Sequence, residues 1–174
     1  MIKRLCKPLP RMLLALLLLG AAGILDAAAA DQPAAKPAEE TIKVVYHADF
    51  ADPRRFSAML SNIHNMVSTY QSELKEYDVH IVFVSYGIRF VTQDKLAGTP
   101  FAEDAALKQR RAELLGRLAT LRDNEGVKLE LCEITREAVH LPREKIIPGV
   151  ALVPSGVVRI AELQHQGYAY LKVE

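Results

Sequence analysis

Short apolar runs alternate with segments of helical periodicity from residue 42 onward, and this alternation constrains the fold more than any other feature. The apolar runs are rich in β-branched residues and predict strands at 42–47, 79–86, 127–132, 150–153 and 168–173. Apolar residues spaced three and four apart predict helices at 53–74, about 104–122 and about 156–166. Strands that alternate with helices imply a parallel sheet with helices on both faces, so the predicted fold class is α/β.

The first thirty residues have the pattern of a secretory signal peptide. A basic segment precedes an apolar run, Met12–Leu25, which is shorter than the roughly twenty residues that a membrane span needs. Ala28 and Ala30 then supply the small-x-small pattern of a signal-peptidase site. We expect cleavage after Ala30, a periplasmic location and no stable membrane span after cleavage; the alternative is an uncleaved anchor. We expect residues 31–41 to be a flexible linker and residues 42–174 to be a single domain.

The charge balance and several missing motifs exclude classes of function. The chain has 22 basic and 21 acidic residues, and removal of the signal peptide leaves 18 and 20, without the clustered basic face that nucleic acid requires. The five histidines show no HxH, HExxH or Cys-x-x-Cys spacing, so no metal site is expected. Glycine-rich nucleotide loops and a GxSxG elbow are also missing from the sequence, so we expect no cofactor and no α/β-hydrolase activity.

The predicted domain has one cysteine, Cys132, at the end of the strand 127–132. Cys6 lies in the predicted signal peptide, so the mature chain has no second thiol for an internal disulfide. A lone thiol at this position is either a buried small apolar residue or a reactive group. The exposure of Cys132 distinguishes the two interpretations. A reactive thiol should be exposed in a pocket, with His47 close by to stabilise the thiolate, whereas a packing residue should be buried.

Four candidate positions follow or end predicted strands: His47, Tyr86–Gly87, Cys132 and Ser155–Gly156. In open parallel sheets, ligands bind beyond the carboxyl ends of the strands, near the point where the strand order reverses. His47 is either the partner of the thiolate or a polar strand terminus that bonds to nearby backbone. Ser155–Gly156 either holds a sulfur oxyanion through free amides at a helix start or is an ordinary N-cap.

Several segments, taken in order, resemble the DsrE/DsrF-like family, particularly its small exported members. They are Val45–His47, Leu60–Asn65, Gly126–Cys132 with Thr135, Val153–Val157 and Leu163–Lys172. The resemblance covers nearly the whole domain. It implies a three-layer, flavodoxin-like sandwich with a five-stranded, mainly parallel sheet, and assembly into a homo-oligomer, a trimer or a hexamer. Cytoplasmic members of the family pass sulfur between proteins as a cysteine persulfide, and Cys132 matches their sulfur-carrying position.

The sequence also departs from the family pattern around the candidate site. Tyr86–Gly87 stands where exported relatives tend to carry a His-Gly pair, and Glu133-Ile134-Thr135 stands where Gly-Asn-Thr is common. A Glu133 carboxylate close to the thiol would disfavour the thiolate. The segment 93–103 is also longer than usual. These departures leave the cysteine in place and change its neighbours.

Three functions remain open for the domain. In the first, it is an exported sulfur carrier that holds a persulfide on Cys132 and exchanges sulfur with a donor or acceptor protein. This function gives catalytic roles to Cys132 and His47, and substrate-binding roles to Tyr86, Gly87, Thr135, Ser155 and Gly156. In the second, it is a non-enzymatic module for small-ligand binding or assembly. In the third, Cys132 senses oxidation.

Overall fold

The computed structural model describes residues 41–174, so the predicted signal peptide and residues 31–40 of the predicted linker lie outside the described residues. The described part forms a five-stranded sheet in the order β4-β3-β2-β1-β5, and every pair of neighbouring strands is parallel. The strands are β1 (Ile42–Ala48), β2 (Tyr77–Phe83), β3 (Lys128–Cys132), β4 (Val150–Val153) and β5 (Ala169–Leu171). The predicted α/β class with a parallel sheet is therefore confirmed.

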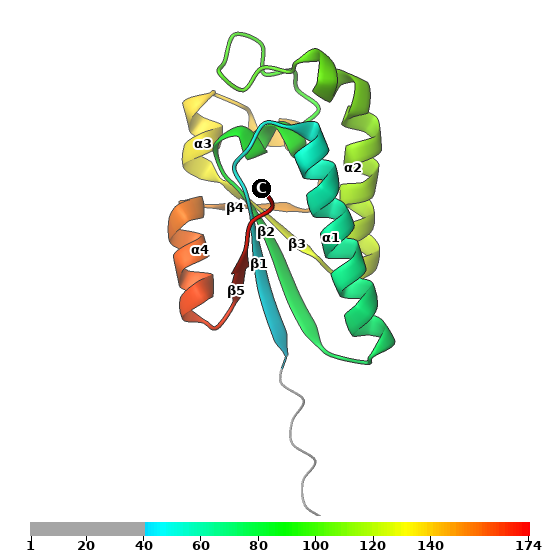
Figure 1. Ribbon diagram of the computed structural model, residues 1–174. Coiled ribbons are helices and arrows are strands. Elements are labelled where there is room, and N and C mark those ends of the chain that lie inside the picture. Colours follow the sequence, from blue (N-terminus) through cyan, green and yellow to red (C-terminus); the bar gives the residue numbers. More distant parts are fainter. Residues whose placement is uncertain (1–40) are drawn as a thin grey trace, which may run out of the picture. The chain divides into compact units, whose positions relative to one another are not determined.

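Helices cover both faces of the sheet, as Figure 1 shows. The long helices α1 (Pro53–Ser72) and α2 (Ala105–Glu125) lie side by side on one face. Helix α4 (Gly156–His165) lies on the other face, and the short α3 (Glu133–Ala138) follows directly on β3. Two 3₁₀ segments, Ser85–Phe90 and Arg143–Lys145, complete the connections. Within residues 41–174, no helix combines the length and the apolar character that a bilayer crossing requires.

The apolar core is divided unequally between the two faces. On the α1 and α2 side, the buried residues of both helices pack on β1, β2 and β3 in one large cluster that includes Phe56, Ile81 and Leu118. On the α4 side of residues 41–174, the buried cluster is small: it consists of Val45, Val82, Ile160 and Leu163, with the partly buried Val84 and Tyr168 packed against it. Because apolar burial is the main favourable contribution to packing, α4 is held to the sheet by far less of it than α1 or α2.

Local signals explain where the long helices begin and end. The Asp52 carboxylate accepts a hydrogen bond from the Arg54 N–H at 2.8 Å, and Pro53 occupies the first helical position, as the sequence predicts. Asp104 caps α2 in the same way. Gly126 ends α2 with φ of 67°, a left-handed conformation that glycine adopts without steric cost.

Three predicted boundaries were wrong. The strand predicted at 79–86 ends at Phe83, because Ser85 has φ of 52° and opens a 3₁₀ segment instead. Helix α1 ends at Ser72, so Leu74, which was counted on its apolar face, is exposed. The last strand pairs only through Ala169–Leu171. Each boundary depends on contacts made elsewhere in the fold, which periodicity does not record.

Candidate functional site

Cys132 is the last residue of β3, and it also precedes the first residue of α3. It pairs with Val153 on β4, and only 4% of its surface is exposed. In an extended strand, alternate residues share a face, so Cys132 lies on the same face as Glu130, whose carboxylate contacts α4 through Arg159. The thiol therefore belongs to the α4 side of the sheet and is covered there.

Gly156 forms part of this cover. A Cβ atom built on Gly156 would lie 3.1 Å from the Cβ of Cys132 and 2.5 Å from Cγ2 of Val84. The backbone at the start of α4 thus lies against the cysteine, and the side chain of Val84 leaves no room for a Cβ atom at this position. The preceding residue, Ser155, is the N-cap of α4 and accepts a hydrogen bond from the Val158 N–H at 3.4 Å. This is the ordinary capping role for Ser155.

His47 lies on β1, on the same face as Cys132, but the two side chains are not neighbours. His47 pairs with Val82 of β2, and Val82 pairs with Glu130, which precedes Cys132 by two residues. With strands about 4.8 Å apart and about 3.3 Å of rise per residue, their Cα atoms are separated by roughly 12 Å. The side chains of Val82 and Val84 fill the space between them, since both face Gly156. Within one chain, His47 is therefore not in contact with the thiol.

His47 instead belongs to a polar cluster at the carboxyl ends of β1 and β5. Its Nδ1 lies 3.0 Å from the Tyr170 hydroxyl, and its Nε2 lies 3.9 Å from Asp49, which also pairs with Lys172 at 2.9 Å. Burial lowers the pKa of His47; Asp49 opposes this change and Lys172 adds to it. The imidazole is therefore mainly neutral at pH 7, and its contact with the Tyr170 hydroxyl orients the ring.

The strand order places this polar cluster where parallel sheets commonly bind ligands. The chain runs outward from β1 through β2 and β3 to β4, and then returns to the other side of β1 as β5. The order reverses between β1 and β5, next to His47 and two strands away from Cys132. This order also differs from the 2-1-3-4-5 order of flavodoxin. The sheet thus places the two predicted catalytic residues, His47 and Cys132, at the same edge but two strands apart.

The other candidate residues hold the loops that surround this edge. A Cβ on Gly87 would lie 2.0 Å from the carbonyl oxygen of Ala48, so only glycine allows the 3₁₀ segment to pass the end of β1. Tyr86 is partly exposed and stacks edge-on against Phe101 at 5.0 Å, which ties the long 93–103 segment to the site. Thr135 is buried, and its hydroxyl accepts a hydrogen bond from the Ser85 N–H at 3.0 Å. Thr135 therefore joins α3 to the end of β2.

Glu133 follows the cysteine, but its carboxylate is held by two arginines. Arg136 donates two hydrogen bonds of 2.8 Å, and Arg143 donates one of 2.5 Å. Hydrogen bonds from Arg136, and then from Arg143, lower the pKa of Glu133 to about 2. The negative charge that the sequence places next to the thiol is therefore neutralised locally by Arg136 and Arg143.

Sequence reasoning missed a charged network beneath α4. His80 is 3% exposed; its Nδ1 lies 3.0 Å from Glu130, and its Nε2 lies 3.1 Å from Asp78. Glu130 also receives two 2.8 Å hydrogen bonds from Arg159 of α4. Burial opposes ionisation of Glu130, but the hydrogen bonds from His80 and Arg159 outweigh it and lower its pKa to about 2. The network was missed because Glu130 alternates with Leu129 and Leu131, a pattern that usually indicates a solvent-facing side chain. In the structure, Glu130 faces α4 instead.

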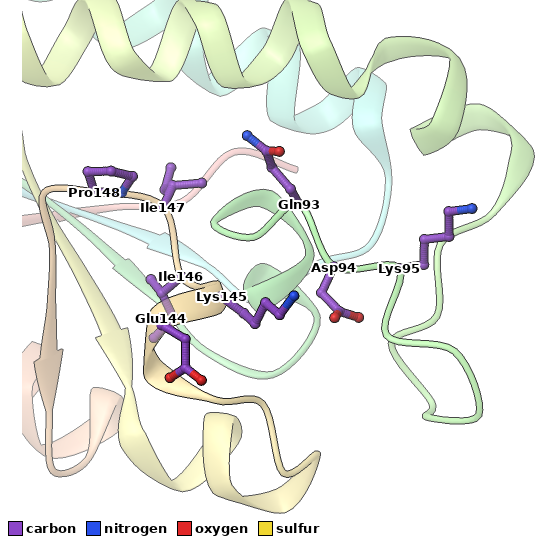
Figure 2. A pocket seen from close by; sticks show the side chains of 8 residues that line it. All are labelled: Gln93, Asp94, Lys95, Glu144, Lys145, Ile146, Ile147 and Pro148. Carbon is purple, nitrogen blue, oxygen red and sulfur yellow. The ribbon is translucent and has the colours of Figure 1, made fainter.

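Two clefts lie near this end of the fold. The larger, of about 680 Å³, runs between residues 93–95 and 144–148 and is rimmed by Asp94, Lys95, Glu144 and Lys145 (Figure 2). Its charges have both signs, and none of the candidate residues lines it, so its size alone does not make it the site. The second, of about 460 Å³, lies between α4 and the edge strand β4. Its lining includes Val153, the pairing partner of Cys132, together with Ser155, Glu130 and Arg159.

Nothing in the described part of the chain forms a metal-binding cluster. Among residues 41–174, no three His, Cys, Asp or Glu side chains converge so as to hold an ion. The chemistry available near Cys132 is therefore that of the thiol, the neighbouring hydroxyls and the backbone amides. At the β1 and β5 ends, a neutral imidazole and a tyrosine hydroxyl lie 3.0 Å apart.

Comparison with known proteins identifies the family. The sequence profile of the DsrE/DsrF-like family matches residues 34–173. No curated protein matches the chain. A solved structure of a protein of unknown function, MTH1491 from Methanobacterium thermoautotrophicum, is similar: it is 24% identical with a TM-score of 0.57, over 75% of this chain and 98% of that one. The ychN protein from E. coli gives 15% identity and a TM-score of 0.42, over 76% and 99%. The chain belongs to the DsrE/DsrF-like family.

Proposed function

We propose that this protein is an exported sulfur carrier that holds a sulfane sulfur on Cys132 as a persulfide. The observation that supports it is the position of the thiol: it is the single cysteine of residues 41–174, and it ends β3 in a member of the DsrE/DsrF-like family. In this family, the cysteine at this position carries sulfur in cytoplasmic members. A thiol with no second cysteine within the described residues is suited to a one-thiol relay rather than to a dithiol cycle.

The proposed transfer is balanced without an external oxidant. The Cys132 thiolate attacks the outer sulfur of a donor persulfide or polysulfide, a new S–S bond forms on Cys132, and the donor's S–S bond breaks. The electron pair of the broken bond leaves with the donor as a thiolate, which takes up a proton. An acceptor thiolate reverses these steps. His47 and Tyr170 lie at the same edge of the sheet but not at the Cys132 sulfur, so the proposed step assigns them no proton transfer to the thiol.

A test follows from the mass of the product. The purified protein is incubated with inorganic polysulfide for minutes to hours, excess reagent is removed, and the intact mass is measured. We expect additions in steps of one sulfur atom, reversed by a thiol reductant and absent in Cys132→Ser. If no sulfur is added even after long exposure, while unfolded protein reacts readily, the sulfur-carrier proposal fails.

The burial of Cys132 favours a second candidate, a non-enzymatic assembly module. Two aliphatic side chains that follow one another in the first turn of α4, Val157 and Val158, are exposed. Exposed apolar groups that adjoin one another commonly mark a contact surface. We propose that this surface is where copies of the chain meet in a trimer or hexamer. Light scattering at micromolar concentration tests it: wild type should give a multiple of the chain mass, and Val157→Asp with Val158→Asp should give a monomer.

A further inference from the structure

Helix α4 buries fewer residues than the long helices α1 and α2, and it is the helix that covers the thiol. Its buried apolar residues are Ile160 and Leu163, whereas α1 buries Phe56, Met59, Leu60 and others against the main core. Gly156, the first residue of α4, lies on Cys132. The exposure of the cysteine therefore depends on how strongly the start of α4 is attached to the sheet. Apolar packing contributes little to this attachment.

A partly buried ionic network, in which Arg159 is about 25% exposed and Glu130 is 9% exposed, also attaches α4 to the sheet. Arg159, three residues into α4 from Gly156, reaches down to the sheet and donates two hydrogen bonds to Glu130. Glu130 is fixed from the other side by His80 at 3.0 Å. Such planar, two-point contacts between guanidinium and carboxylate restrict geometry as well as adding energy. The two hydrogen bonds restrict both the distance of the first turn of α4 from β3 and the rotation of the helix about its axis.

The far end of α4 is tied to the same network. Tyr168, just after the helix, donates a hydrogen bond of 2.9 Å to Asp78, whose carboxylate lies 3.1 Å from Nε2 of His80. The Tyr168 ring also packs edge-on against His80 at 5.2 Å. His80 thus lies between the two attachments, which join α4 to the sheet at both ends.

We propose that the His80–Glu130–Arg159 network is a positioning device that keeps α4 closed over Cys132, and that exposure of the thiol requires local release of α4 rather than unfolding of the domain. Arg159 acts here through the position of Gly156 and does not touch the sulfur. The cleft of about 460 Å³ beside Arg159 and Ser155 gives an incoming sulfur donor a place next to this cover. A biological role for this network rests on the proposed sulfur-carrier function. Its effect on the accessibility of the Cys132 thiol can be measured independently of that function.

Native-state alkylation of Cys132 with iodoacetamide tests the proposal. Wild type should react slowly because the thiol is covered, and Arg159→Met should react at least roughly tenfold faster, since loss of one partner of a buried pair is costly. Arg159→Lys keeps the charge without the two-point contact and should react at an intermediate rate. Arg110→Met is the matched control: Arg110 pairs with Glu113 on α2, on the opposite face, and its loss should leave the rate unchanged.

Denaturant dependence separates local release from general loss of stability. Opening of α4 alone exposes little surface, so alkylation of Arg159→Met should be nearly independent of low urea concentrations. Leu118→Ala, in the core of the other face, should react faster only in proportion to global unfolding, with a steep urea dependence. If Arg159→Met shows the same steep dependence, Arg159 is merely structural and the proposal is overturned. The double variant Glu130→Gln with Arg159→Met, which leaves no buried charge without its partner, should also react fast if the single variant folds poorly.

The two proposals fail in distinguishable ways. If wild type takes up sulfur but Arg159→Met alkylates no faster, the positioning role is wrong and the sulfur-carrier function stands. If Arg159→Met alkylates faster through local opening but no form takes up sulfur, the cover is real and the carrier function is wrong.

Discussion

Substitution of Gly156 by alanine should destabilise the domain, although alanine is the better helix former. The new methyl group would lie 2.5 Å from Cγ2 of Val84 and 3.1 Å from the Cβ of Cys132, so at least one neighbour must move. Overpacking of this kind costs about 1–3 kcal/mol, and the helical preference of alanine over glycine returns up to about 1 kcal/mol. With the full return of about 1 kcal/mol, the net loss in the free energy of unfolding is at most about 2 kcal/mol.

A second glycine in the same chain provides the control. Gly116 lies in α2, and a Cβ built there meets no atom within 4 Å, so Gly116→Ala should stabilise by about 0.5–1 kcal/mol. Urea denaturation followed by circular dichroism measures both variants. Gly156→Ala should also alkylate faster at Cys132, because the start of α4 is pushed outward. If Gly156→Ala were as stable as Gly116→Ala, the close contact between α4 and the cysteine would be refuted.

The partner of the clash can be tested directly. Val84→Ala removes the methyl group that Gly156→Ala would meet, so the double variant should lose less stability than the sum of the two single changes. A coupling free energy of about 0.5–1 kcal/mol or more is expected for groups in contact. Strict additivity would mean that the two sites do not touch.

Three further expectations concern the support of the site. Gly87→Ala should destabilise by more than Gly156→Ala, because its Cβ would meet backbone, the Ala48 carbonyl oxygen at 2.0 Å, which has little freedom to move; thermal unfolding measures the difference. Thr135→Val should cost about 1–3 kcal/mol, since it leaves the Ser85 N–H without its acceptor, and Thr135→Ser should restore most of the loss. The pKa of Glu130, lowered from 4.5 to about 2, gives stability that is complete above pH 4.5 and lost as the pH falls through 2. Between these limits, wild type should lose on the order of 3 kcal/mol more than Glu130→Gln in urea titrations, and equal losses would contradict the ionised, hydrogen-bonded state.

The fold was predictable because the strands and helices of this chain alternate with clear local signals. Asp52-Pro53 and Asp104 mark the starts of two helices through their own side chains, so local sequence suffices to find them. The end of α2 was predicted near residue 122, whereas the helix continues to Glu125 and ends at Gly126. The run 79–83 is apolar except for His80 and is typical of a strand that is covered on both faces. Its end could not be found in the same way, because the turn at Ser85 is fixed by Thr135, which lies fifty residues further along the chain.

The candidate site was less accessible from sequence, for reasons of topology. Its members could be assigned to one edge of a parallel sheet, but the distance between His47 and Cys132 depends on the strand order, which places β2 between them. The burial of Cys132 depends on the contact with Gly156. Because glycine has no side chain, it lets the start of α4 approach the cysteine closely, and a sequence pattern does not reveal such a contact. Glu130 occupies a strand position that faces α4. A charged residue is normally predicted to be exposed, and only the contacts with Arg159 and His80 explain why this one is buried.

The pairing of β5 with β1 determines when the sheet is completed during synthesis. Val44, in the first strand, pairs with Ala169, near the end of the described chain, so one edge of β1 has no partner until the ribosome has made almost all of the domain. An unpaired strand edge is a template for pairing with other chains, and this exposure lasts for most of translation. The same arrangement makes β5 the strand most easily lost, since it pairs through three residues only. Proteolytic trimming of this end would reopen the edge of β1 and remove Tyr170 from His47, while the cover over Cys132 remained in place.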